Sequence, residues 1–196
     1  MIRAALIGTG NISPVHLNYL QKRDDVEIVG LCDIKPENLA RRQEVYGGKG
    51  FEDYRDLIDE IEPDAMWLCT PPQVRREPLT LCAERGIPVL CEKPVGRELA
   101  EARRTAEALR ELDAKVQIGY VFRSIPTVRR LVEALADDRV HLVQSFYGCG
   151  VGLSRSLAPW FYDKDLSGGA LIDQATHNLD LLRMLMGEAS EVRGLA

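Results

Sequence analysis

A carboxylate and a histidine in one predicted helix are the first residues of this sequence that could do chemistry. The periodicity of residues 169–186 predicts a helix. Gly168 and Gly169, at the start of this helix, allow the backbone to approach a neighbouring group closely. Asp173 and His177 lie four positions apart, so their side chains share one face, and Asp180 continues along that side. Such a pair can transfer a proton, because histidine titrates near neutral pH. The alternative is a helix-capping aspartate beside a solvated or core histidine.

Lys93 is the third candidate, because it follows a short apolar stretch, residues 89–91, that predicts a strand. A lysine amine that is partly desolvated and lies near another positive charge gives up its proton more readily. It could then share a proton with a substrate hydroxyl. The alternative is a solvated surface charge.

A glycine-containing turn near the N-terminus predicts the site of the cofactor. An apolar run ends at Gly8-Thr9-Gly10, and Pro14 follows where the first turn of a helix is expected. The free N–H groups of such a turn, at the positive end of a helix dipole, bind a pyrophosphate. The dinucleotide fingerprint has a third glycine or alanine where this chain has Ser13, which is small enough for close helix–strand packing. An ordinary strand–turn–helix is the alternative.

Asp33 supports the cofactor interpretation. It follows a second predicted strand, residues 26–32, at about the distance from Gly10 where an acidic residue binds the adenosine ribose hydroxyls. Its carboxylate should repel a 2′-phosphate, which favours NAD over NADP, although the nearby Lys35 weakens that preference. A turn aspartate is the alternative.

Composition excludes several classes of protein. The 196 residues carry a net charge of −5, which gives no indication of a nucleic-acid-binding face. No apolar run approaches the roughly 18 residues that span a bilayer, and the chain enters its first strand directly, so we expect neither a membrane segment nor a signal peptide. The five cysteines lack a C-x-x-C pattern, which predicts reduced thiols in a cytoplasmic protein without a metal site. They are Cys32, Cys69, Cys82, Cys91 and Cys149.

Predicted strands and helices alternate through about residue 120, which indicates an α/β fold with a doubly wound parallel sheet, a Rossmann domain over residues 1–120. Ligands of such sheets bind beyond the carboxyl ends of the strands, which places Thr70-Pro71, after the strand at 65–69, at the site. Residues 121–196 predict an incomplete α+β domain. Its expected elements are a helix at 125–136, a strand at 140–147, a loop at 148–168, the helix at 169–186 and a strand beginning at 191–195.

Together these elements resemble the Gfo/Idh/MocA oxidoreductases, the relatives of glucose–fructose oxidoreductase and inositol dehydrogenase. The resemblance covers essentially the whole chain in order. It rests on Gly8-Thr9-Gly10-Asn11-Ile12 with His16 downstream, Asp33, Thr70-Pro71-Pro72, Glu92-Lys93-Pro94, and the run from Gly168 to Asp180.

The resemblance implies a nicotinamide-dependent dehydrogenase that transfers hydride between NAD, with NADP less favoured, and a secondary alcohol of a sugar, cyclitol or related polyol. By position, His177 exchanges the hydroxyl proton, Lys93 polarises the substrate oxygen and Asp173 orients hydroxyl and imidazole. Arg123 and Trp160 match positions that border the substrate pocket; a surface charge and a core aromatic are the alternatives. The implied cofactor-binding residues are Gly8, Gly10, Asn11, Ile12, Asp33, Thr70, Pro71, Glu92 and Lys93.

The chain also departs from the family pattern. Ser13 replaces the third glycine, Arg75 stands where many members have a histidine and is expected at the pocket rim, and Phe161 stands where an arginine is common. Family members continue into an open sheet that walls the substrate site and commonly forms a homo-oligomer interface. Without that cover the helix at 169–186 is expected to expose leucines, among them Leu171, Leu179, Leu182 and Leu185. A truncated, non-catalytic protein that binds nucleotide is therefore the alternative function.

Overall fold

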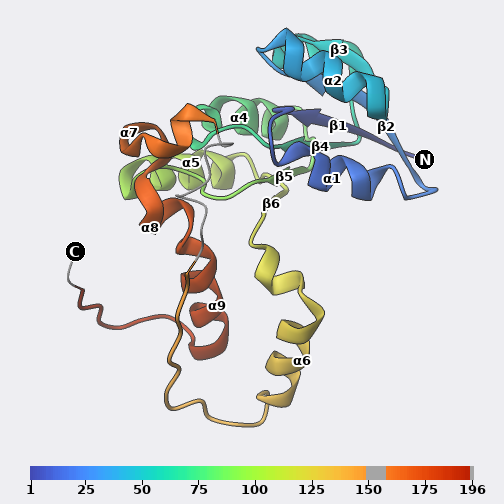
Figure 1. The fold of residues 1–196 in the computed structure, drawn as a ribbon. Coiled ribbons are helices and arrows are strands. Elements are labelled where there is room, and N and C mark those ends of the chain that lie inside the picture. The colour runs from blue at the N-terminus through green and yellow to red at the C-terminus, as the bar shows by residue number, and fades with distance from the viewer. Residues whose placement is uncertain (149–157, 195–196) are drawn as a thin grey trace.

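The structure is a computed structural model that describes residues 1–148 and 158–194. Cys149, part of the predicted loop at 148–168 and the end of the strand expected at 191–195 lie outside the described residues. The N-terminal part is a layered α/β unit, and Figure 1 shows α6 (Pro126–Ala134) and α9 (Thr176–Met186) below its sheet. None of the helices in the described ranges combines the length and apolar character that a bilayer-spanning helix requires.

A six-stranded parallel sheet forms the centre of the N-terminal part. Its order is β3-β2-β1-β4-β5-β6, with every neighbouring pair parallel, which is the doubly wound order of a dinucleotide-binding domain. The predicted Rossmann sheet is therefore confirmed. The strands are β1 Ile2–Ile7, β2 Val26–Cys32, β3 Lys49–Phe51, β4 Ala65–Leu68, β5 Val89–Cys91 and β6 Val116–Ile118.

Helices cover both faces of this sheet, because its strands are apolar on both sides. On one face, α1 (Ser13–Leu20) and α2 (Pro36–Tyr46) bury leucines against Leu6 and Leu31. On the other, α3 (Tyr54–Ile61), α4 (Arg76–Glu84) and α5 (Leu99–Glu111) pack against Ile7, Met66 and Leu68. The carboxyl ends of the strands stay uncovered by these helices, which leaves that edge for the site.

Two local features of this part follow from single residues. Asp53 caps α3 by accepting a hydrogen bond from the backbone N–H of Arg55. Pro78 delays the helix that follows β4 and does not kink it. A 3₁₀ turn, Pro72–Val74, comes first, and α4 starts at Arg76, so the proline occupies the first turn.

The described part of the chain after residue 120 contains helices and turns but no strand, so the expected α+β character of this part is wrong for these residues. The predicted helix at 125–136 is confirmed as α6, Pro126–Ala134. The other elements are η2 Val121–Ser124, η4 Pro159–Tyr162, α7 Lys164–Ser167, α8 Gly169–Asp173 and α9 Thr176–Met186.

The strand expected at 140–147 is absent from the structure, and residues 191–194 are not in a strand either. Two apolar residues of the alternating pattern at 140–147, Leu142 and Phe146, are 84% and 95% exposed. A strand needs a neighbour for its backbone N–H and C=O groups, and neither segment is paired with one in the described residues.

The single helix predicted over 169–186 is two helices, α8 and α9, so Asp173 and His177 do not share a helix face. In a continuous helix the N–H of His177 would donate to the carbonyl of Asp173. Here that carbonyl accepts from the Lys93 amine at 2.6 Å, and the His177 N–H donates to the carbonyl of Gln174 at 3.4 Å. A contact from a distant part of the chain thus accompanies the break in the helix.

The packing of α3 gives a test of the core. Leu57→Ala is expected to lower the free energy of unfolding by about 2–5 kcal/mol, because it leaves a cavity where Leu57 is fully buried. The same substitution at Leu99, 65% exposed at the start of α5, should change it by less than about 0.5 kcal/mol. Urea unfolding followed by circular dichroism measures both, and equal effects would contradict this assignment of the core.

Candidate active site

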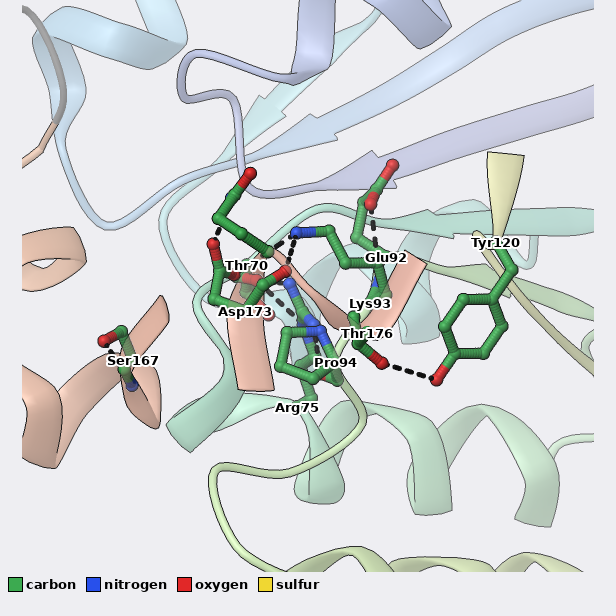
Figure 2. Close-up of polar contacts among 11 residues, drawn as sticks. Thr70, Arg75, Glu92, Lys93, Pro94, Tyr120, Ser167, Asp173 and Thr176 are labelled. Carbon is green, nitrogen blue, oxygen red and sulfur yellow. Dashed lines mark hydrogen bonds and ion pairs between the residues drawn. The ribbon is translucent and has the colours of Figure 1, made fainter. Parts of the chain in front are cut away.

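The Lys93 side chain links the Rossmann sheet to the C-terminal helices. Lys93 follows β5, and its amine donates to the carbonyl of Asp173 at 2.6 Å and to Oδ1 of Asp173 at 3.3 Å. Figure 2 shows the amine directed at both oxygens. The Lys93 side chain is 11% exposed and that of Asp173 is 6% exposed. This ion pair is therefore largely desolvated and positioned by charge-assisted hydrogen bonds.

Asp173 is held from several sides. Its Oδ2 accepts from the Gln174 side-chain amide at 2.5 Å. The preceding turn approaches the segment after β5 closely: Gly168 has a φ of +83°, and a Cβ there would lie 2.7 Å from the carbonyl oxygen of Arg97. Arg97 also donates to the carbonyl of Asp165 at 2.8 Å. The close approach expected at Gly168-Gly169 thus occurs at Gly168 and seats α7 and α8 against the Rossmann domain.

His177 lies in the first turn of α9 against an aromatic wall from the segment after β6. Its ring stacks on Phe122, with centroids 5.2 Å apart, and meets Tyr120 edge-on at 6.4 Å. Its Nδ1 is buried and makes no hydrogen bond with the described residues. Burial and then the nearby Lys93 cation lower the pKa of His177 below its usual value of 6.5. The imidazole is thereby favoured in its neutral form, which can accept a proton.

Arg123 and Asp180 fix α9 to the same segment. Asp180 is 5% exposed, and its two carboxylate oxygens accept from Nε and Nη2 of Arg123 at 2.7 and 2.6 Å. A two-point pair of this kind has a defined geometry. A second contact, between the hydroxyls of Tyr120 and Thr176 at 3.4 Å, joins the same elements (Figure 2).

Glu92, beside the lysine, pairs with His16 on α1. Nε2 of His16 lies 2.8 Å from Oε1 of Glu92, and both side chains are about 15% exposed. Burial acts to raise the pKa of Glu92, but the His16 hydrogen bond and neighbouring cations outweigh it and hold the pKa below its usual range. The carboxylate stays charged and ties the loop after β5 to α1.

The loop between β1 and α1 has the shape of a dinucleotide site. Gly8 has a φ of +94°, and a Cβ there would lie 2.7 Å from the backbone of Cys69, so a side chain does not fit. A Cβ on Gly10 would meet nothing within 4 Å, which leaves space above the loop. The hydroxyl oxygen of Thr70 is buried without a hydrogen-bond partner in the described residues. These features fit a bound group that supplies polar atoms over the loop.

The remaining predicted cofactor residues surround this loop. Ser13 is fully buried and its hydroxyl donates to the carbonyl of Gly10 at 2.8 Å, as expected of a small residue at the helix–strand contact. Oδ2 of Asp33 accepts from the N–H and hydroxyl of Thr9 at 2.7 and 3.0 Å. Asn11 is exposed, and Ile12 is 40% exposed at the start of α1.

A cavity of about 900 Å³ lies at this edge of the sheet. Its lining includes Gly8, Asp33, Thr70 and Pro71 and continues over α4 and α5, while Lys93 lies outside the lining. Four of the residues predicted to bind the nucleotide therefore line one hollow, and Gly10, Asn11, Ile12, Glu92 and Lys93 lie outside its lining. The described residues hold no group of three or more histidine, cysteine, aspartate or glutamate side chains placed to bind a metal ion.

One predicted residue lies elsewhere than the sequence suggests. Arg75 is 3% exposed and buried beneath the loops, so its expected place at the pocket rim is wrong. Trp160 lies in η4 and packs edge-on against Phe161, with ring centroids 5.8 Å apart. Sequence reasoning missed Phe122 as the ring that contacts His177, because an aromatic residue in a predicted turn has no spacing that singles it out.

Comparison with known proteins identifies relatives over almost the whole chain. The family model described as an oxidoreductase family with an NAD-binding Rossmann fold matches residues 2–120. The model of the GFO/IDH/MocA C-terminal domain matches residues 125–196.

Among curated proteins, the rhizopine catabolism protein MocA of Rhizobium meliloti is 30% identical, over 95% of this chain and 57% of its own length. The myo-inositol 2-dehydrogenase of Thermotoga maritima is 28% identical, over 97% of this chain and 56% of its own length. The WlbA dehydrogenase of Bordetella pertussis, crystallised with NADH and UDP-GlcNAcA, superposes with a TM-score of 0.82 and is 27% identical. That match covers 94% of this chain and 57% of WlbA, so the chain spans just over half the length of the relatives it matches.

The lowered pKa of His177 predicts a pH dependence of stability. Below pH 6.5 the unfolded chain binds a proton at this residue that the folded chain resists, so the free energy of unfolding should fall as pH drops through 6.5. The fall should level off below the folded pKa. His177→Gln should remove this fall in the free energy of unfolding. His141→Gln, at an exposed histidine, should leave the fall in place. Urea unfolding between pH 5 and 8 measures it, and an unchanged profile in His177→Gln would contradict the assignment.

Proposed function

Because the chain belongs to the GFO/IDH/MocA oxidoreductase family, we propose that it is an NAD-dependent dehydrogenase of a sugar, cyclitol or related polyol. The reaction transfers hydride between the nicotinamide cofactor and a secondary alcohol. The observation that carries the proposal is the buried Lys93–Asp173 pair beside His177, whose Nδ1 has no partner among the described residues.

The proposed cofactor residues are those around the first loop and the adjoining strand ends. A bound nicotinamide dinucleotide supplies the acceptor or donor of the hydride. The loop at Gly8 and Gly10, at the start of α1, holds the diphosphate, and Asp33 lies where the adenosine ribose is expected. NADH in the WlbA complex supports this choice. The full proposed set is Gly8, Gly10, Asn11, Ile12, Asp33, Thr70, Pro71, Glu92 and Lys93.

Three side chains do the proposed proton chemistry. His177 in its neutral form accepts the hydroxyl proton, and the Lys93 amine donates a hydrogen bond that polarises the substrate oxygen. Asp173 orients the lysine through its carbonyl and carboxylate. The family resemblance implies that Asp173 orients the hydroxyl and the imidazole. The hydrogen bonds of Asp173 instead join it to Lys93 and Gln174.

The substrate side is proposed from residues 121–196, taken as a substrate domain next to a cofactor domain at 1–120. Arg123, fixed by Asp180, and Trp160 are proposed to border the substrate. The name of the Thermotoga maritima relative supports a cyclitol, and UDP-GlcNAcA in the WlbA complex supports a sugar.

The cellular setting is proposed from the thiols. Cys32, Cys69, Cys82 and Cys91 are free and buried, and burial raises the pKa of Cys91 to about 11. Unreactive free thiols support a reducing cytoplasm.

The exposed leucines support two further parts of the proposal. Of the four leucines expected to be exposed, Leu171 and Leu179 are 67% and 49% exposed on α8 and α9, whereas Leu182 and Leu185 are half-buried. Exposed apolar side chains support self-association into a homo-oligomer. The same exposure favours a second candidate function, a nucleotide-binding protein without turnover.

Cofactor binding is tested at Gly10. Gly10→Ala places a methyl group in the open space above the loop, so the Kd for NADH should rise at least about tenfold, a loss of roughly 1.4 kcal/mol. Gly194→Ala, which also meets no atom within 4 Å, is the matched control and should leave the Kd unchanged. Fluorescence titration with NADH measures both. An unaltered Kd in Gly10→Ala would refute the placement of the cofactor.

Catalysis is tested at Lys93. Lys93→Met removes the amine that polarises the substrate, so kcat/KM for an active polyol should fall by about 10²–10⁴. Binding of NADH should stay measurable, because the other proposed cofactor residues are unchanged. The lost Lys93 contact should raise the Kd by no more than about tenfold, roughly 1.4 kcal/mol. Lys115→Met, at an exposed lysine, serves as the control and should retain full turnover.

Two results would argue against the enzyme. Normal turnover by Lys93→Met would mean that the chemistry is wrongly assigned. NADH binding by the unmodified chain without reduction of NAD by any sugar or cyclitol would favour the second candidate function.

A further inference from the structure

Arg75 is a buried cation that the proposed chemistry does not use. It directly precedes α4, is 3% exposed, and burial lowers the pKa of its guanidinium. Removing an arginine from water is costly unless its donors find acceptors. A residue buried at that cost calls for a structural or functional reason.

The guanidinium finds its acceptors on two different loops. Nε and Nη2 donate to the carbonyl of Thr70 at 2.9 and 2.5 Å, and Nη1 donates to the carbonyl of Pro94. Thr70 follows β4 and Pro94 follows β5, so one planar side chain bridges the ends of two neighbouring strands (Figure 2). Among the described residues, the groups that accept from the guanidinium are carbonyls and not a carboxylate.

Each bridged loop carries part of the site. Thr70 and Pro71 line the cavity, and the Thr70 hydroxyl oxygen is buried and unpaired. Pro94 directly follows Lys93, whose amine contacts Asp173. A shift of the guanidinium would therefore move the cavity wall and the lysine together.

The fork of the guanidinium explains why arginine suits this place. Its donors point in fixed, different directions in one plane, so it can serve two carbonyls at once. A glutamine amide is shorter and can reach one of them. A lysine amine keeps the charge and can rotate its donors, but it lacks the planar fork.

We propose that Arg75 is a positioning residue, which fixes the Lys93 loop relative to the Thr70–Pro71 wall so that the lysine amine stays on Asp173. The part of this inference that concerns turnover rests on the proposed function. The part that concerns the placement of Lys93 does not.

The test reads the environment of Lys93 directly. The whole chain is labelled with a trace of acetic anhydride, and peptide mass spectrometry compares acetylation of Lys93 with that of Lys22 and Lys115, both exposed. In the unmodified chain Lys93 should label far more slowly than these references, because its amine is hydrogen-bonded and 11% exposed.

Arg75→Gln should raise the relative labelling of Lys93 about tenfold, as expected from the loss of a charge-assisted hydrogen bond. Arg75→Lys should restore it to within about threefold of the original, since the ammonium keeps the charge and can rotate its donors toward the carbonyls of both loops. Arg85→Gln, at the exposed end of the same helix where Arg85 pairs with Asp59, is the matched control and should change nothing. Circular dichroism and thermal melts confirm that each variant is folded.

Kinetics supply the second readout. With an active polyol, Arg75→Gln should lower kcat by about a hundredfold, the effect of misplacing a reacting group by about 1 Å. The KM for the polyol should stay within about threefold. A loss of fold alone would lower the amount of active enzyme without exposing Lys93 in the folded fraction.

Three results overturn the inference: a folded Arg75→Gln with unchanged Lys93 labelling, equal labelling in Arg75→Lys and Arg75→Gln, or unfolding of both variants, which would make Arg75 a residue of general stability. The failure of the proposed function looks different. If the unmodified chain shows no turnover while Lys93 labelling still depends on Arg75, the positioning role holds and the dehydrogenase assignment falls.

Discussion

The hydrogen bonds from the Lys93 amine to Asp173 are the interaction on which the site depends. They join residues 80 positions apart in the chain and bring the end of β5 to the end of α8. The same amine occupies the carbonyl that would otherwise continue the helix, and α9 begins anew at Thr176. His177 consequently faces the aromatic rings after β6 and not the carboxylate four positions before it. One desolvated contact thus sets the relative places of lysine, carboxylate and imidazole.

The parallel sheet supplies the second constraint. Because all six strands run the same way, the loops after β1, β2, β4 and β5 meet at one edge. Hydrogen bonds between loops then fix their spacing: Asp33 to Thr9, Glu92 to His16, and Arg75 to Thr70 and Pro94. Arg75 and Asp173, two buried charged residues at this edge, are hydrogen-bonded to carbonyls and to donors respectively, which limits the cost of desolvation.

Local sequence patterns predict most of the first 120 residues. Apolar runs of buried strands are short-range signals, so the strands expected at 26–32, 65–69 and 89–91 lie within one residue of β2, β4 and β5. The break between Asp173 and Thr176 and the burial of Arg75 depend on partners far along the chain, which no local pattern encodes. The alternation at 140–147 predicted a strand, but a strand also requires a neighbouring edge, and periodicity says nothing about that.

The central claim is that the dinucleotide and the His177 imidazole occupy one site. The most direct measurement is an NMR titration of the imidazole ¹⁵N resonances with NADH, in which His141, exposed and distant in sequence, is the internal reference. The account predicts that the His177 resonances shift with the same saturation curve as NADH binding while those of His141 stay in place. Saturable binding of NADH that leaves the His177 resonances unmoved would contradict it.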